Sequence, residues 1–197
     1  MDKSITIGDL KKNIEACTLC EADLPYLPKP VFSFSARSKI LIVGQAPGMK
    51  VQETGIPWND ASGDTDYVIG CRYPKNSIMI RNIFQLYLWH SVIQAKVSLE
   101  DLPPPTKCAE TWMQPILDKV PERRITLLIG QYAQAWFLQT RKKSTLTETV
   151  QNWQEYQPEY FVLQHPSPRN NIWLTKNPWF EKKLVPKLKK KIKGLII

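Results

Sequence analysis

The chain has 197 residues and a mass of 22.8 kDa, enough for one compact α/β domain and too little for two full enzyme domains. Because 43% of the residues are apolar, disorder is excluded as the main state, and no apolar run reaches the ~18 residues of a membrane span. Lys and Arg outnumber the acidic residues by 27 to 18, a formal charge of +9. This excess favours a polyanionic partner, nucleic acid ahead of a membrane, unless it serves solubility alone.

The first 38 residues are interpreted as an N-terminal arm. Residues 1–20 predict a short helix that ends in the motif CTLC, and residues 21–38, with three prolines, predict an extended segment. The start of the chain lacks the apolar stretch of a secretory signal, so we expect a cytoplasmic protein. In that compartment cysteines are thiols or metal ligands rather than disulfides. The chain has four of them: Cys17, Cys20, Cys71 and Cys108.

Three apolar runs predict buried strands, at residues 39–44 (KILIVG), 125–129 (ITLLI) and 160–164 (YFVLQ). Runs without polar alternation are typical of parallel strands that are buried on both faces. Helical segments lie between these strands. The pattern predicts a single domain over residues 1–197, with a three-layer α/β/α fold around a central parallel sheet. In such sheets ligands bind at the carboxyl ends of the strands.

The last predicted helix is amphipathic. Asn177 is a favourable N-cap, and Pro178 suits the first turn. Apolar residues recur at every fourth position, which is typical of a helix packed on a core; they are Phe180, Leu184, Leu188 and Ile192. The opposite face is basic and carries Lys182, Lys183, Lys187, Lys190 and Lys191.

The loop after the first buried strand, residues 44–63, carries unusual chemistry. Gly44 and Gly48 allow a sharp turn and a close approach of the backbone to a ligand, although many such turns are merely tight connections. Trp58 offers a flat stacking surface, with ordinary core packing as the alternative. Polar groups follow at Asn59, Asp60 and Asp64.

The loop after the last strand, residues 165–171, is the second unusual segment. His165 directly follows the strand and precedes Pro-Ser-Pro, which fixes the path of the loop. A neutral imidazole there can donate a hydrogen bond to a developing oxyanion; the alternative is a histidine that only caps the strand. Arg169, Asn170 and Asn171 can meet phosphates or stacked bases.

Together, the two loops resemble the uracil-DNA glycosylase superfamily. The motifs are GQAPG at residues 44–48 and HPSP at residues 165–168, and ITLLIGQYAQA between them is similar to a strand-and-helix segment of that superfamily. The glycines and Pro57-Trp58 of the first loop are spaced as in its iron–sulfur branch. The resemblance covers about residues 14–70 and 101–193, and it implies that the central parallel sheet has four strands. It implies hydrolysis of the N-glycosidic bond of uracil, or a related damaged base, after the base is flipped out of DNA.

The resemblance also implies roles for individual residues. Trp58 would stack on the flipped base, the amides of Gln45 and Ala46 would contact it, and His165 would stabilise the departing uracil anion. Water-activating members carry an acidic residue in the first motif, whereas Gln45 and Ala46 are not acidic, so Asp60 is preferred over Asp64 as a substitute. The rest of the base pocket is assigned to Gly44, Pro47 and Gly48, and DNA contacts to Ser167, Arg169, Asn170, Lys183 and Lys187.

The cysteines suggest a cofactor. Members of the iron–sulfur branch hold a 4Fe–4S cluster with an N-terminal C-x-x-C and two later cysteines, and Cys17, Cys20 and Cys108 match three of these four positions. Cys71 does not match the fourth, and three thiolates hold such a cluster poorly. The alternative is a set of unrelated thiols; no other cofactor is expected.

Residues 71–100 depart from the family. The family has a strand here that ends near "PMGFCYPG", and this chain resumes the family pattern only at residues 101–104. Codons can be chosen for His90 to Glu100 such that the same nucleotides, read two bases later, give FCYPGKGKSG. Ser77 to Phe84 yields YYDPKHF in a similar way. We infer a frameshift, with a deletion after Gly70 and an insertion near Glu100, unless the segment is a divergent insert. A core strand is then expected to be missing, and His90 to carry no function.

The sequence therefore favours a monomeric DNA-repair glycosylase whose partner is DNA. One alternative is a catalytically impaired relative that only binds nucleic acid, which the loss of the acidic residue and the replaced strand favour. A second alternative is a metal or redox module built on the C-x-x-C motif.

Overall fold

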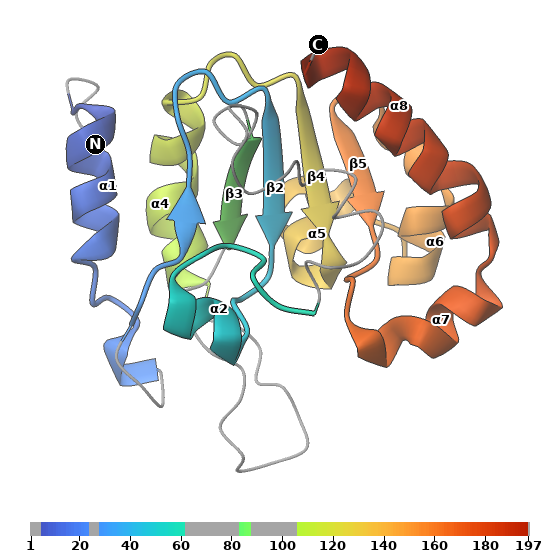
Figure 1. Cartoon of the computed structure of the whole chain (residues 1–197), viewed down its shortest axis with the longest axis horizontal. Coiled ribbons are helices and arrows are strands. Elements are labelled where there is room, and N and C mark those ends of the chain that lie inside the picture. Colours follow the sequence, from blue (N-terminus) through green and yellow to red (C-terminus); the bar gives the residue numbers. More distant parts are fainter. Residues whose placement is uncertain (1–4, 24–27, 62–82, 88–105, 197) are drawn as a thin grey trace.

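A mixed sheet forms the centre of the molecule (Figure 1). The computed structural model describes residues 5–23, 28–61, 83–87 and 106–196. Four neighbouring strands run parallel and a short edge strand runs antiparallel to its neighbour. In spatial order they are β1 (Phe32–Ser33), β3 (Ile83–Tyr87), β2 (Ile40–Gly44), β4 (Ile125–Ile129) and β5 (Tyr160–Leu163).

The predicted α/β fold class is confirmed, and the sheet differs from the prediction in two places. It has five strands rather than four, because residues 32–33 of the predicted arm pair along β3. The expectation that residues 71–100 lack a core strand is wrong, since β3 lies within this segment and pairs with β2 over Ile83–Tyr87. The sequence IFQLY is mostly apolar and has the length of a strand. A run of this kind can form a strand even where the segment does not follow the family pattern.

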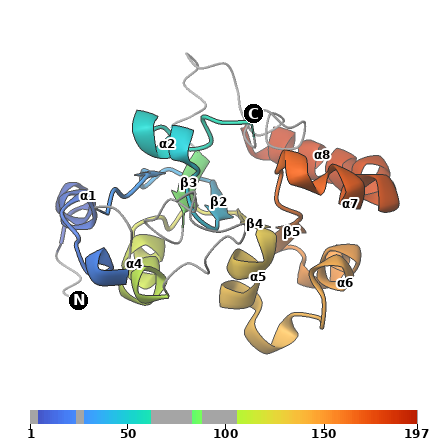
Figure 2. The ribbon, with the colours of Figure 1, turned by 90° about the horizontal axis from the view of Figure 1, so that it is seen from below.

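Helices cover both faces of the sheet, as Figure 2 shows from below. One face is covered by α1 (Ile7–Glu15), α4 (Lys107–Asp118) and α5 (Gly130–Leu138). The other face is covered by α2 (Met49–Thr54), the π-turn Phe180–Leu184 and α8 (Val185–Ile196). Near β5, α6 (Leu146–Gln151) contacts that strand and α7 (Asn171–Lys176) follows its loop. The predicted three layers are therefore present.

Side-chain alternation along β2 explains why both faces are covered. Leu41 and Val43 join the core beneath α1 and α4, whereas Ile40 and Ile42 join the core beneath α8. All four are buried. A strand that is apolar at every position needs helices on both faces to keep it from water. The apolar stripe predicted for the last helix is also confirmed, because Phe180, Leu184, Leu188 and Ile192 are all buried.

Helix ends follow local capping chemistry. The Thr6 hydroxyl accepts a hydrogen bond from the Asp9 amide at 3.1 Å, so α1 begins at Ile7 rather than at the start of the chain. The last helix begins later than predicted: Asn177 accepts the Phe180 amide through its backbone carbonyl, and the π-turn precedes α8. Among the described helices, none is long and apolar enough to cross a membrane.

Candidate active site

Three strand ends meet at one edge of the sheet. β2, β4 and β5 are neighbouring parallel strands, so the segments that follow them emerge side by side. Gln45 follows β2, Gly130 follows β4, and Gln164 and His165 follow β5. The two loops singled out in the sequence therefore meet at the carboxyl edge of the sheet, as predicted.

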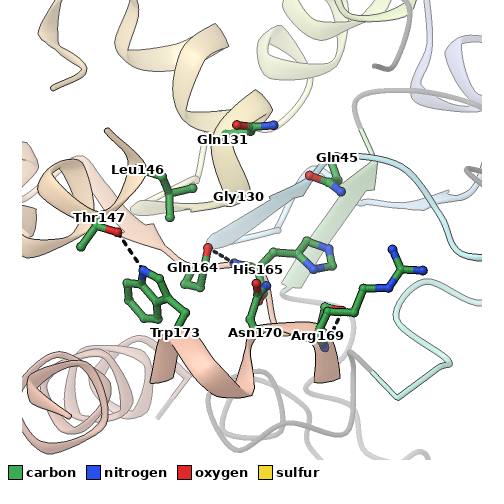
Figure 3. A pocket seen from close by; sticks show the side chains of 11 residues that line it. Gln45, Gly130, Gln131, Leu146, Thr147, Gln164, His165, Arg169, Asn170 and Trp173 are labelled. Atoms are coloured by element: carbon green, nitrogen blue, oxygen red, sulfur yellow. Dashed lines mark hydrogen bonds between the residues drawn. The ribbon is translucent and has the colours of Figure 1, made fainter. Parts of the chain in front are cut away.

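An open cavity of about 430 Å³ lies where these loops meet (Figure 3). One wall comes from the strand ends and the other from α6 and α7. Among the residues that line it, His165 and Arg169 are the ionisable ones and none is a carboxylate. The lining residues are Gln45, Gly130, Gln131, Leu146, Thr147, Gln164, His165, Ser167, Arg169, Asn170 and Trp173.

His165 is held through its backbone, and its imidazole projects toward Gln45 (Figure 3). Its amide donates to Gln164 Oε1 at 3.0 Å, and its carbonyl oxygen accepts from Asn170 Nδ2 at 2.7 Å. The imidazole is half-buried, and its ring centroid lies 6.2 Å from that of Trp58. Asn170, predicted as a DNA contact, thus uses its amide to fix the loop that carries His165.

Gly130 separates Gln45 from His165. Its φ is +83°, a conformation that glycine adopts without steric strain. A Cβ at this position would lie 3.3 Å from Gln45 Oε1 and 3.6 Å from His165 Cβ. The absence of a side chain at Gly130 therefore allows the two functional groups to approach each other.

Gln134 ties the ends of two strands together beneath the cavity. Its side chain is fully buried, and Nε2 donates to the Leu163 carbonyl at 2.9 Å and to the Leu128 carbonyl at 3.5 Å. These carbonyls belong to β5 and β4, so the bonds fix the spacing of the strands that carry His165 and Gly130.

Trp58 lies deeper than its predicted role requires. It is 1% exposed, packs in the core beneath α8 and does not line the cavity. Its φ of +58° is unusual for a bulky residue, and such strain is found at positions that the surrounding structure determines strongly. In this structure the Trp58 ring lies beside that of His165, with the two planes inclined by 36°, and its stacking on a base stays a prediction.

Asp60 lies against the first motif. Its Oδ2 would be 3.1 Å from a Cβ at Gly48, which explains why the turn has glycine there. Asp60 is half-buried and does not line the cavity. Asp64, the other candidate carboxylate, lies outside the described residues. In the first motif Gly44 and Pro47 are buried, while Gln45 and Ala46 are half-buried.

The predicted DNA contacts divide between two places. Arg169 is exposed beside the cavity, and its amide donates to Ser167 Oγ at 3.2 Å (Figure 3). Lys183 and Lys187 are exposed on the C-terminal helical segment. In Figure 1, α8 runs from the neighbourhood of α7 back toward the opposite edge of the sheet. Neither lysine lines the cavity beside His165.

The three candidate cluster ligands are buried between the N-terminal segment and α4. Cys20 Sγ and Cys108 Sγ lie 2.9 Å apart, and Trp112 Nε1 donates to Cys17 Sγ at 3.2 Å. Among the described residues, however, no three histidine, cysteine or acidic side chains are grouped closely enough to hold a metal ion. Cys71 and His90 lie outside the described residues. The thiols that the structure describes do not by themselves form a complete cluster site.

Sequence reasoning missed the wall formed by α6 and α7. Trp173 Nε1 donates to Thr147 Oγ1 at 2.8 Å and joins these two short helices across the cavity. Leu146 of α6 belongs to the same wall, and Gln131 of α5 also lines the cavity. A tryptophan and a threonine that are 26 residues apart carry no sequence signal of such a contact.

A comparison with protein families identifies the chain. The family model described as uracil DNA glycosylase superfamily matches residues 32–189, which is most of the chain. The chain belongs to the uracil-DNA glycosylase superfamily. The match includes both loops of the cavity, whereas Cys17 and Cys20 lie before it, so it provides no support for the iron–sulfur branch. Proteins of this superfamily are glycosylases that act on DNA.

Membership of the superfamily allows the role of Gly130 in activity to be tested by substitution. We expect Gly130→Ala to lower any base release by roughly tenfold or more, because the methyl group pushes Gln45 and His165 apart. The strain at positive φ adds about 1–3 kcal/mol of destabilisation. Gly55→Ala is the matched control, since Gly55 has φ +65° but a Cβ there meets nothing within 4 Å. Equal losses of activity in the two variants would show that backbone strain, and not the contact, is responsible.

Proposed function

We propose that the chain is a DNA-repair glycosylase that hydrolyses the N-glycosidic bond of uracil, or a related damaged base, flipped out of DNA. The observation that carries this proposal is the convergence of His165 and Gln45 on one open cavity at the carboxyl edge of the sheet. The cavity volume lies within the usual range of small-molecule pockets.

The proposed reaction breaks the bond between the deoxyribose C1′ and the base nitrogen. The bonding electron pair leaves with the nucleobase. A water oxygen adds to C1′ and loses a proton to solvent or to a carboxylate that acts as general base. His165 donates a hydrogen bond to the oxygen of the departing base, where negative charge develops. Gln45 orients the water, but an amide cannot take up its proton at neutral pH. Asp60, which is half-buried and does not line the cavity, is the described carboxylate that the sequence favours for that step.

The missing acidic residue favours slow catalysis. Proton transfer by a positioned base contributes about 10²–10⁴-fold to a rate, and no carboxylate among the described residues lines this cavity. The same observation favours a second candidate function, a catalytically impaired relative that binds nucleic acid without releasing a base. The two functions differ in a single measurable product.

The deciding experiment measures uracil release from a single-stranded oligonucleotide that contains one uracil. The control oligonucleotide has thymine at the same position. We expect slow, enzyme-dependent release from the uracil substrate and none from the control. Binding of both oligonucleotides with no release from either would support the second candidate function.

The basic residues predict a strong dependence of DNA binding on salt. If Lys182, Lys183, Lys187, Lys190 and Lys191 all contact phosphates, a plot of log K against log salt should have a slope of about −4.5 for duplex DNA and about −3.5 for a single strand. Lys183→Gln should reduce the slope by about 1. The same change at Lys12, on α1 and the other face of the sheet, should leave it unchanged. A flat response between about 50 and 200 mM salt would show that the lysines are only a solvated surface.

An iron–sulfur cluster is a separate proposal. Cys17, Cys20 and Cys108 would supply three thiolates to a 4Fe–4S cluster, and a fourth ligand would have to come from outside the described residues. No step of the proposed hydrolysis passes through this group. Iron content and a visible absorbance band of the purified protein test the proposal and also test the alternative of a redox module.

A further inference from the structure

A second cavity lies at the other end of the sheet. Its volume is about 440 Å³, and it opens between α8 and the segment that leads into β5. It includes Phe161, near the start of β5, whereas His165 follows the end of the same strand. The two cavities share no lining residue. The residues that line the second are Trp153, Gln157, Phe161, Lys187, Lys190, Lys191, Gly194 and Leu195.

The floor of this groove is aromatic. The half-buried Trp153 stacks on Phe161, with ring centroids 5.3 Å apart and planes inclined by 16°. Phe161 is buried and holds the indole in place, and Trp153 contributes to the lining of the groove. A fixed, flat aromatic surface of this kind can stack with another planar ring, such as a nucleobase.

The rim of the groove is basic. Lys190 and Lys191 follow Lys187 by three and four positions on α8, so all three lie on one side of the helix. All three are exposed, and none forms a salt bridge with an acid in the part of the chain that the structure describes. Three neighbouring ammonium groups repel one another, and an anion between them would relieve that repulsion.

We propose that this groove binds a nucleotide of single-stranded nucleic acid, with its base on Trp153 and its phosphates between the three lysines. An aromatic floor beside a basic rim is the combination that single-strand-binding proteins use. A duplex fits less well, because its bases are already stacked on each other and present no free face. The proposal concerns binding alone and does not depend on glycosylase activity.

The first test changes the charge of the rim. The double variant Lys190→Gln/Lys191→Gln should weaken binding of a labelled oligothymidylate about 10 nucleotides long by roughly tenfold at low salt. The matched control Lys189→Gln/Lys193→Gln removes the same charge from the same helix, outside the groove. We expect a loss of less than about twofold from the control. Equal losses from both variants would overturn the proposal, because binding would then depend only on net charge.

The second test fills the groove without changing its charge. A Cβ at Gly194 meets nothing within 4 Å, so Gly194→Leu can place a side chain in the groove without a clash. This variant should also weaken oligothymidylate binding by about tenfold, with an unchanged melting temperature. Wild-type affinity in Gly194→Leu, or an equal loss of affinity for duplex DNA, would refute base stacking in the groove. Uracil release is measured separately, so failure of this proposal and failure of the proposed function are distinguishable.

Discussion

Replacing His165 by alanine is expected to lower base release by about 10²-fold, the typical loss when one transition-state hydrogen-bond donor is removed. His165 lines the cavity, its ring is half-buried, and its position is set by its backbone bonds with Gln164 and Asn170. Those backbone bonds persist in His165→Ala, so the free energy of unfolding should change little. Single-turnover release of uracil and thermal melting together measure both quantities.

His165→Asn is the informative companion variant. Asparagine keeps a neutral N–H donor at this position. We expect His165→Asn to retain more activity than His165→Ala. An unchanged rate in His165→Ala, accompanied by a large loss of stability, would identify His165 as a structural residue.

Asn170 offers a test of positioning rather than of chemistry. Its amide donates to the His165 carbonyl at 2.7 Å, so Asn170→Ala removes a bond that orients the loop without removing the imidazole. Asn170 is predicted to contact DNA and is observed to bond to the loop. The Asn170→Ala variant distinguishes these two roles. Loss of positioning lowers the rate of release, whereas loss of a phosphate contact weakens binding and its salt dependence.

The positions of the two loops were predictable because each loop directly follows its own strand. A buried apolar run such as residues 40–44, ended by a glycine, fixes where the loop emerges. Parallel pairing then brings the loops after β2 and β5 to the same edge, with only β4 between them. Nothing beyond local sequence and the rules of parallel sheets was needed to predict this part of the site.

Other parts of the site depend on contacts between distant segments. Trp58 has the residue type expected of a stacking surface, but its burial is decided by how α8 and the first loop pack over β2. The bond between Trp173 and Thr147 depends on the relative placement of two short helices. Neither property follows from spacing along the chain, because neither involves a repeated pattern.

β3 shows a different failure of prediction. The expectation of a missing strand came from the departure of residues 71–100 from the family pattern, rather than from their own hydrophobicity. The structure places Ile83–Tyr87 between β1 and β2, so the backbone hydrogen bonds of β2 are satisfied on both sides. Strand formation needs an apolar run of suitable length, which unrelated sequence can also supply.

Restoring the inferred reading frame between Gly70 and Asp101 is expected to change the protein more than any point substitution. The restored segment would read FCYPGKGKSG before residue 101 and would place a cysteine near position 91. Together with Cys17, Cys20 and Cys108 it would complete the four thiolates that a 4Fe–4S cluster requires. We therefore expect higher iron content and a visible absorbance band in the restored protein, and little of either in the chain as it stands.

Solubility and activity should rise as well. The present segment contains apolar runs at residues 78–80 and 86–89, and such runs favour association between chains where they are exposed. Since β3 already supplies the backbone partner of β2, the benefit must come from side chains rather than from a new strand. The two proteins should be expressed side by side and compared in soluble yield, cooperativity of melting, iron content and uracil release. If the present chain equals the restored one in all four, residues 71–100 are a divergent but functional insert, and the frameshift inference is wrong.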